Sequence, residues 1–423
     1  MSRRRVIENI LSLGSLQAAS YLLPFLTLPY LARVLGPEDL GRIAFALAFA
    51  QIFVILTEYG FNLTASQEIS VNRDDPQRVA EIFSAVTVLR AGIMALGFIV
   101  LLILVLTIPR FEQDIAIYLS SYMLVVGSVL FPQWLFQGLE QLKIVSIIQI
   151  IARVIAAAGI FLLVKTKEDL LWAVWMQSAN MALAGLLTLP FIFIALRGVR
   201  LKLPTRSALA SQLREGWHIF VSSLAANSYT TSSIFILGLV LTPLAVGYYS
   251  VAEKLVRALL MMFGPIIQAI YPYISKMAHD DPARALGFNR KLLIGLGSLA
   301  LVLSLGLSLS SGIVVPFLFG AGFEPAIPVL ATLAFTPLFI VLSNILGVQT
   351  MIPFGMKALF SSVMLKAALL NLLVFIPLAW QFGPQGAAAA NVLVEAFVMV
   401  YLFMLLHWHG KNPMTYTLVA KQI

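Results

Sequence analysis

Apolar segments of about twenty residues, separated by short charged breaks, run through the whole chain. They give twelve candidate helices, at residues 9–33, 42–66, 83–107, 115–139, 144–165, 170–196, 217–241, 246–273, 291–317, 327–350, 357–380 and 386–408. Each is long enough to cross about 30 Å of hydrocarbon at about 1.5 Å per residue. Hydrophobic residues make up 60% of the chain and charged residues 11%, whereas a soluble protein has about 45–50% and about 25%. The chain is therefore predicted to be an all-α integral membrane protein.

The charge distribution predicts the orientation of these helices. The formal net charge is +9, which in a soluble protein would suggest nucleic acid as a partner. In a membrane protein, Lys and Arg gather instead in cytoplasmic loops. With the N-terminus inside, eighteen Lys and Arg fall in inside segments and five in outside segments. We therefore expect both termini in the cytoplasm and no nucleic-acid partner.

The two halves of the sequence repeat each other. Residues 15–21 match residues 223–229 at five of seven positions, and Pro37…Gly41…Ala46 matches Pro243…Gly247…Ala252. The segment Asp-Asp-Pro-x-Arg occurs at residues 74–78 and again at residues 280–284. Three matches in order at offsets of 206 to 208 indicate an internal duplication.

A duplication of six spans keeps both copies in the same orientation, as in transporters built from parallel repeats. We expect two pseudo-symmetric six-helix lobes around a central cleft. The predicted lobes are residues 1–196 and residues 217–423, the second with a short cytoplasmic tail, and a basic cytoplasmic linker at 197–216 joins them.

Ionisable residues inside the predicted spans point to a site. A charged side chain at mid-bilayer costs about 2.5–3.5 kcal/mol on insertion scales, so it normally faces a cavity or a partner. Five are basic and three are acidic: Arg90, Arg153, Lys254, Arg257 and Lys366, and Glu58, Glu253 and Glu395. The excess of basic groups favours a cationic cleft for an anionic ligand, such as a diphosphate that links a sugar to a lipid carrier.

Two alternatives apply to these charges. The basic groups could be consumed by internal ion pairs, for example of Glu253 or Glu395 with Lys366. Arg90 lies close enough to a helix end to reach the membrane surface instead of the cleft. Glu58, Glu253 and Glu395 are candidates for ion coupling.

A polar run, NSYTTSS at residues 227–233, interrupts the seventh predicted span. Asn227, Thr230 and Thr231 could form a cleft wall that meets sugar hydroxyl groups. Hydrogen bonding between helices is the alternative, because small polar residues also serve that purpose in membranes.

Motifs for enzymatic chemistry and for metal binding are not evident. The two Asp-Asp-Pro segments are typical of helix starts, where Asp caps and Pro occupies the first turn. The chain has no Cys and no P-loop, and His407 and His409 are too close in sequence to share a helical face. We expect a transporter without a metal or cofactor, and no loop is long enough for a catalytic domain.

The first two spans carry the clearest family resemblance. Residues 21–70 include PYLARVLGP, then GRIAFA, then Glu58-Tyr59-Gly60-Phe61. This stretch resembles the bacterial polysaccharide-export family, whose members include the O-antigen (Wzx-type) flippases of the multidrug/oligosaccharidyl-lipid/polysaccharide exporter superfamily.

The resemblance implies a twelve-helix transporter in the bacterial inner membrane. It would flip undecaprenyl-diphosphate-linked oligosaccharide by alternating access, driven by a proton or sodium gradient. Its partners would be the lipid-linked oligosaccharide, membrane lipid and other polysaccharide-assembly proteins. The alternatives are a multidrug or cation antiporter of the same superfamily, a membrane-embedded polymerase or glycosyltransferase, and a transport-inactive scaffold. The antiporter is disfavoured because the spans are net basic, and the enzyme because the outer loops are short.

Overall fold

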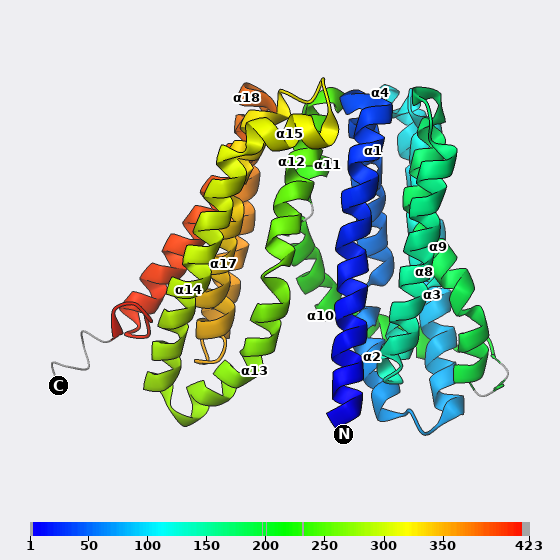
Figure 1. The fold of residues 1–423 in the computed structure, drawn as a ribbon. Helices are drawn as coiled ribbons and strands as arrows, with labels where there is room; N and C mark the ends of the chain where they lie inside the picture. Colours follow the sequence, from blue (N-terminus) through cyan, green and yellow to red (C-terminus); the bar gives the residue numbers. More distant parts are fainter. Residues whose placement is uncertain (1–2, 197, 200, 231, 417–423) are drawn as a thin grey trace. The chain divides into compact units, whose positions relative to one another are not determined.

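The protein is an assembly of helices, seen in a computed structural model that describes residues 3–196, 198–199, 201–230 and 232–416 (Figure 1). No strand occurs in these ranges. The chain divides into two compact units, Met1–Asn227 and Ser228–Ile423. The division falls inside a helix, and the predicted limits of the two lobes stay a prediction.

The first unit contains the helices of the first half of the chain. They are α1 (Arg3–Glu58), α2 (Phe61–Val71), α3 (Pro76–Thr107), α4 (Pro109–Glu112), α5 (Ile115–Ser121), α6 (Met123–Leu130), α7 (Gln133–Gly138), α8 (Leu142–Leu163), the short η1 (Lys167–Asp169) and α9 (Leu170–Ala195). Most of α10 (Arg206–Thr230) also belongs to it. Helix α9 packs against α6 and α8, and α1 packs against α8. Phe61, Trp134 and Phe136 are fully buried in a core cluster of this unit.

The second unit repeats this all-helical construction. Its helices are α11 (Ser232–Val240), α12 (Pro243–Met261), α13 (Gly264–Asp280), α14 (Pro282–Leu309), α15 (Ser311–Phe319), α16 (Ala326–Leu333), α17 (Thr336–Leu346), the π-helical η2 (Gly347–Met351) and α18 (Lys357–Trp408). Helix α17 packs against α14 and α18, and Phe263, Val363 and Leu402 are buried in the core cluster there.

The described helices account for the twelve predicted spans. Nine segments of the described chain are long and apolar enough to cross a membrane. Two of them contain a break at a glycine with positive φ, Gly36 (φ 83°) and Gly383 (φ 62°), and each break separates two predicted spans. Helices α10 and α11 occupy the position of the seventh predicted span. The prediction of a twelve-helix all-α membrane protein is confirmed.

Equivalent positions of the sequence repeat have the same structural role in both units. Asp75 accepts hydrogen bonds from the backbone N–H groups of Gln77 and Arg78 at the start of α3. Asp281 accepts one from the N–H of Arg284 at the start of α14. Ala46 and Ala252 are both fully buried. The Asp-Asp-Pro segments are thus helix caps, as the sequence predicted, and the units are pseudo-symmetric.

Several boundaries differ from the prediction, since the predicted spans 115–139, 291–317 and 327–350 are each divided into shorter helices, and two further differences have a clear physical cause. Helix α10 begins at Arg206 inside the segment predicted as a linker, because the Thr205 hydroxyl accepts the N–H of Ala208 and strong helix formers follow. The eighth predicted span is two helices, α12 and α13, separated at Met262–Phe263. Pro265 explains this break, because proline donates no backbone hydrogen bond and clashes with the preceding helical turn.

The close packing of α6 on α9 depends on glycine. A Cβ atom at Gly127 would lie 2.4 Å from the backbone N of Ala182, and one at Gly185 would lie 2.6 Å from Leu130 Cβ. We expect Gly127→Ala to lower the midpoint of thermal unfolding in detergent by several degrees, because overpacking costs about 1–3 kcal/mol. Gly306→Ala is the matched control, since its Cβ would meet no atom within 4 Å. Equal midpoints for the two variants would show that this contact does not limit stability.

Candidate functional site

The charged face of α12 is the centre of the candidate site in the second unit. Arg257 donates from both Nε and Nη2 to Glu253 Oε1, each at 2.7 Å. The two residues are four apart and therefore lie on the same face of the helix. The sequence left open that acidic and basic groups within the spans form internal ion pairs, with Lys366 as the expected partner of Glu253. Such a pair is present, and the partner of Glu253 in it is Arg257.

Lys254 makes the net charge of this face of α12 positive. It is partly buried, and the charges of Glu253 and Arg257 both act on it. Among the described residues no hydrogen-bond or ion-pair partner of its ammonium group is found. One carboxylate thus faces two basic side chains, so the group carries one net positive charge within a membrane span.

Lys366 meets an aromatic group. Its Nζ donates to the Tyr401 hydroxyl at 2.7 Å and lies 5.0 Å from the centroid of the same ring. Tyr401 is stacked on Phe397, with the ring centroids 5.5 Å apart. All three residues belong to α18. The hydroxyl and the ring together stabilise an exposed ammonium group inside a predicted span.

A buried polar network next to the charged face escaped the sequence prediction. Tyr249 is fully buried on α12, one turn before Glu253, and its hydroxyl accepts a hydrogen bond from Asn391 Nδ2 of α18. Asn371 Nδ2 donates to Asn391 Oδ1 at 3.4 Å. Asn371 and Asn391 were recognisable as polar residues within apolar spans, but only the fold shows that they meet Tyr249.

Arg90 lies in the interior of the first unit. It is 2% exposed, and Nη2 donates to the carbonyl oxygen of Ser128 in α6 at 2.9 Å. Its Nε is buried without a hydrogen-bond partner in the described part of the chain. Glu58, the last residue of α1, is near enough for its charge to act on Arg90. The Arg90 side chain is thus buried against α6, and its predicted place, in the cleft or at the membrane surface, stays a prediction.

The other predicted site residues are placed as follows. Arg153 is partly buried midway along α8, and Glu395 is partly buried in α18. The side chains of Asn227 and Thr230, and the whole of Thr231, lie outside the described residues. The structure brings Glu253, Lys254 and Arg257 together on α12. A common cleft for these groups and those of the first unit stays a prediction.

The described residues hold no group of three or more His, Asp or Glu side chains that could bind a metal ion. Helices α12 and α18 offer ammonium groups, a guanidinium, a carboxylate, phenols and amides. Such groups bind and orient a ligand with hydrogen bonds and charge.

Comparisons with known sequences identify relatives that align with most of this chain. A family described as "Polysaccharide biosynthesis protein" matches residues 6–278. A protein of Escherichia coli (strain K12) named "Putative O-antigen transporter" is 33% identical and aligns with 94% of this chain and 95% of its own length. A protein of Haloferax volcanii named "Probable low-salt glycan biosynthesis flippase Agl15" is 24% identical, over 88% of this chain and 77% of its own.

Solved structures share the fold at low sequence identity. The lipid II flippase MurJ, in an inward closed conformation, has a TM-score of 0.73 and 14% identity and covers 94% of this chain and 87% of its own. A multidrug resistance transporter of the MATE family, in an inward-facing conformation, has a TM-score of 0.70 and 13% identity. The match covers 94% of this chain and 96% of that transporter. Because a glycolipid flippase and a drug exporter both match, the fold does not decide the cargo.

The Glu253–Arg257 pair can be tested with a double-mutant cycle. We expect Glu253→Gln and Arg257→Gln each to lower the midpoint of thermal unfolding by a few degrees, because each leaves one charge without its partner in a membrane span. The double variant should lose less than the sum of the two. The control combines Glu253→Gln with Lys202→Gln. The shift in its unfolding midpoint should equal the sum of the shifts of the two single variants. Additive shifts for Glu253 and Arg257 would contradict a stabilising pair.

Proposed function

Because this chain belongs to the polysaccharide biosynthesis protein family, we propose that it is a flippase for lipid-linked oligosaccharide. The cargo is an undecaprenyl-diphosphate-linked O-antigen unit or a related polysaccharide repeat unit, moved across the bacterial inner membrane. The observation that carries the proposal is the 33% identity to the O-antigen transporter homologue over almost the full length of both chains. Two pseudo-symmetric units would rock against each other and expose the cargo to alternate sides.

The net positive charge of the candidate site supports an anionic cargo. Glu253 offsets one of the two basic side chains near it on α12, and Lys254 keeps an ammonium group without a partner among the described residues. A diphosphate is a suitable ligand for such a group, since charge-assisted hydrogen bonds to its oxygens offset the cost of the buried charge. Arg153 and Lys366 would add positive charge to the same path, whereas Arg90 is buried against α6 and donates to Ser128.

A multidrug antiporter is the second candidate, favoured by the fold shared with the multidrug resistance transporter. A carrier of cationic drugs needs net negative charge along its path, since like charges repel at close range. The spans of this chain contain five basic and three acidic residues. The charge balance therefore favours the flippase.

The proposed activity is transport, and no catalytic step is part of it, since the relatives have the names of transporters and flippases. A proton or sodium gradient would supply the energy, with Glu58, Glu253 and Glu395 as the coupling candidates. Both termini would lie in the cytoplasm, and other polysaccharide-assembly proteins would deliver and receive the cargo.

Complementation tests the proposal. We expect the chain to restore surface O-antigen in a bacterial strain that lacks its own O-antigen flippase. Arg153→Ala, Lys254→Ala and Arg257→Ala should each reduce export at least tenfold, because the diphosphate would lose a cationic partner. Surface polysaccharide would be measured by gel electrophoresis of extracted lipopolysaccharide, with the amount of protein in the membrane measured in parallel.

Lys202→Ala is the control, because it removes an exposed basic residue outside the described helices. Its export should equal that of the unaltered chain. Unaltered export in all three span variants would overturn the cationic path. Failure to complement, together with increased resistance to cationic drugs, would favour the antiporter.

A further inference from the structure

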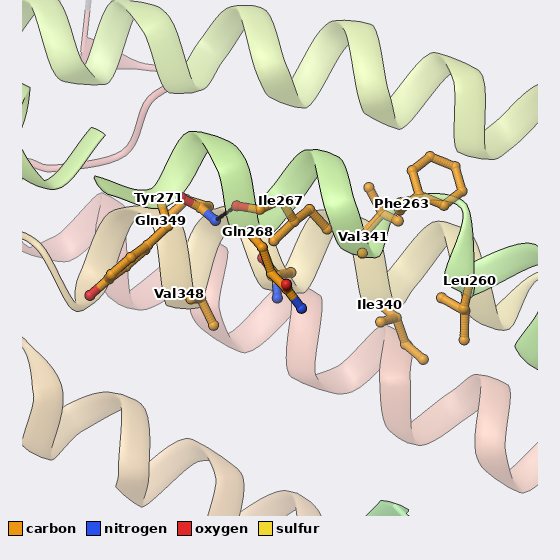
Figure 2. Close-up of a pocket in the computed structure, with 11 residues that line it drawn as sticks. Leu260, Phe263, Ile267, Gln268, Tyr271, Ile340, Val341, Val348 and Gln349 are labelled. Atoms are coloured by element: carbon orange, nitrogen blue, oxygen red, sulfur yellow. Dashed lines mark hydrogen bonds between the residues drawn. The ribbon is translucent and has the colours of Figure 1, made fainter. Parts of the chain in front are cut away.

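A pocket in the second unit lies at the end of α12, one helical turn after Arg257, and none of the charged side chains of α12 lines it. Its volume is about 500 Å³, and it lies between the start of α13 and the end of α17 (Figure 2). The polar side chains that line it are those of Gln268, Tyr271, Asn344 and Gln349, and the others are apolar. No charged side chain lines this pocket.

The pocket lies where two spans depart from regular helix. Between α12 and α13 the chain breaks at Met262–Phe263, and α17 passes into the π-helical turn η2. Breaks and π-helical turns are expensive in a membrane, because backbone groups lose their regular partners, and they concentrate at functional sites. Here Gln349 joins the two spans, since its Nε2 donates to the carbonyl oxygen of Ile267 in α13 at 3.1 Å.

The π-helical turn η2 is packed against α14 and the start of α18. Asn289 of α14 is fully buried, and its Nδ2 donates to the Gln349 carbonyl oxygen and to Thr350 Oγ1, each at 3.0 Å. Gly347 permits the close approach of Phe360, since a Cβ atom at this position would lie 2.4 Å from its ring. These contacts hold the η2 side of the pocket, where Gln349 lies, in place before any ligand binds.

Three polar side chains of the pocket are left for a ligand, and a fourth, Gln349, has its Oε1 buried without a partner in the described part of the chain. Gln268 and Tyr271 have no side-chain hydrogen bond to the described part of the protein, and Gln268 is exposed. Asn344 Oδ1 is buried without a partner in the same part. A half-turn of the Asn344 carboxamide exchanges its oxygen and nitrogen, so the residue can present either a donor or an acceptor. Each of the three side chains can therefore both donate and accept.

The chemistry of the lining identifies a class of ligand. Neutral groups that both donate and accept pair best with hydroxyl groups, which also do both. The Tyr271 ring and the apolar side chains of Phe263 and Ile267 suit the C–H faces of a sugar ring. A phosphate is disfavoured because no cation lines the pocket.

We propose that this pocket binds a sugar of the lipid-linked cargo, separately from the groups that meet the diphosphate. The inference rests on the proposed function and adds a site for the saccharide to it. Gln268, Tyr271 and Asn344 recognise hydroxyl groups, and the charges of α12 recognise the phosphates.

The purified full-length chain in lipid nanodiscs allows a direct test. Binding is measured for undecaprenyl diphosphate and for undecaprenyl diphosphate that carries one N-acetylglucosamine. The ratio of the two affinities reports the sugar together with the terminal phosphate charge that the sugar removes, and the change in this ratio between variants isolates the contacts with the sugar. We expect the unaltered chain to prefer the glycosylated lipid, Asn344→Leu to reduce this preference about tenfold, and Tyr271→Phe to reduce it about threefold, while both variants bind the bare lipid as before.

Tyr273→Phe is the matched control, because it removes a hydroxyl from the same helix at an exposed position outside the pocket lining. It should leave the preference unchanged. Equal binding of the two lipids by the unaltered chain, or a preference retained in Asn344→Leu and Tyr271→Phe, would overturn the sugar site. Complementation of O-antigen export together with such a result would leave the proposed function intact, whereas failure to bind either lipid would count against the function itself.

Discussion

The hydrocarbon interior of the membrane offers no water to polar groups, and the architecture of this chain follows from that constraint. Backbone hydrogen bonds must be made within each span, and the described part of the protein accordingly contains helices and no strands. The same constraint acts on side chains. Glu253 is bonded to Arg257, Lys366 to Tyr401, and Arg90 to the carbonyl oxygen of Ser128. Each of these contacts lowers the cost of a charge that a membrane span would otherwise exclude.

Two departures from regular helix in the second unit lie beside polar groups. The break before Pro265 and the π-helical turn at Gly347–Met351 lie on either side of the pocket with its amide and phenol groups. Irregular backbone at membrane depth is tolerated where it is buried in protein or lines a cavity. The two departures therefore line one cavity. Asn289 donates to the backbone of the π-helical turn, and Gln349 of that turn donates to the backbone of α13.

The proposed function separates the recognition of the cargo into two kinds of chemistry. Charge on α12 suits the phosphates, which every lipid-linked unit of this class would share. Neutral hydrogen-bonding groups suit the sugars, which differ from one polysaccharide to another. Such a division explains how a superfamily fold found in a lipid II flippase and in a drug exporter can serve different cargoes through a few side chains.

The sequence by itself determined the membrane class, the twelve spans, the internal repeat and the helix caps at Asp75 and Asp281, because hydropathy, spacing and local capping chemistry act over short stretches of chain. It also identified the charged side chains within the spans, whose free-energy cost in hydrocarbon requires a partner or a cavity. Only the tertiary structure decided their partners. Tyr249 meets Asn391 across 142 positions of sequence, and Gln349 meets Ile267 across 82. Contacts between residues so far apart depend on how the helices pack, which no local pattern encodes.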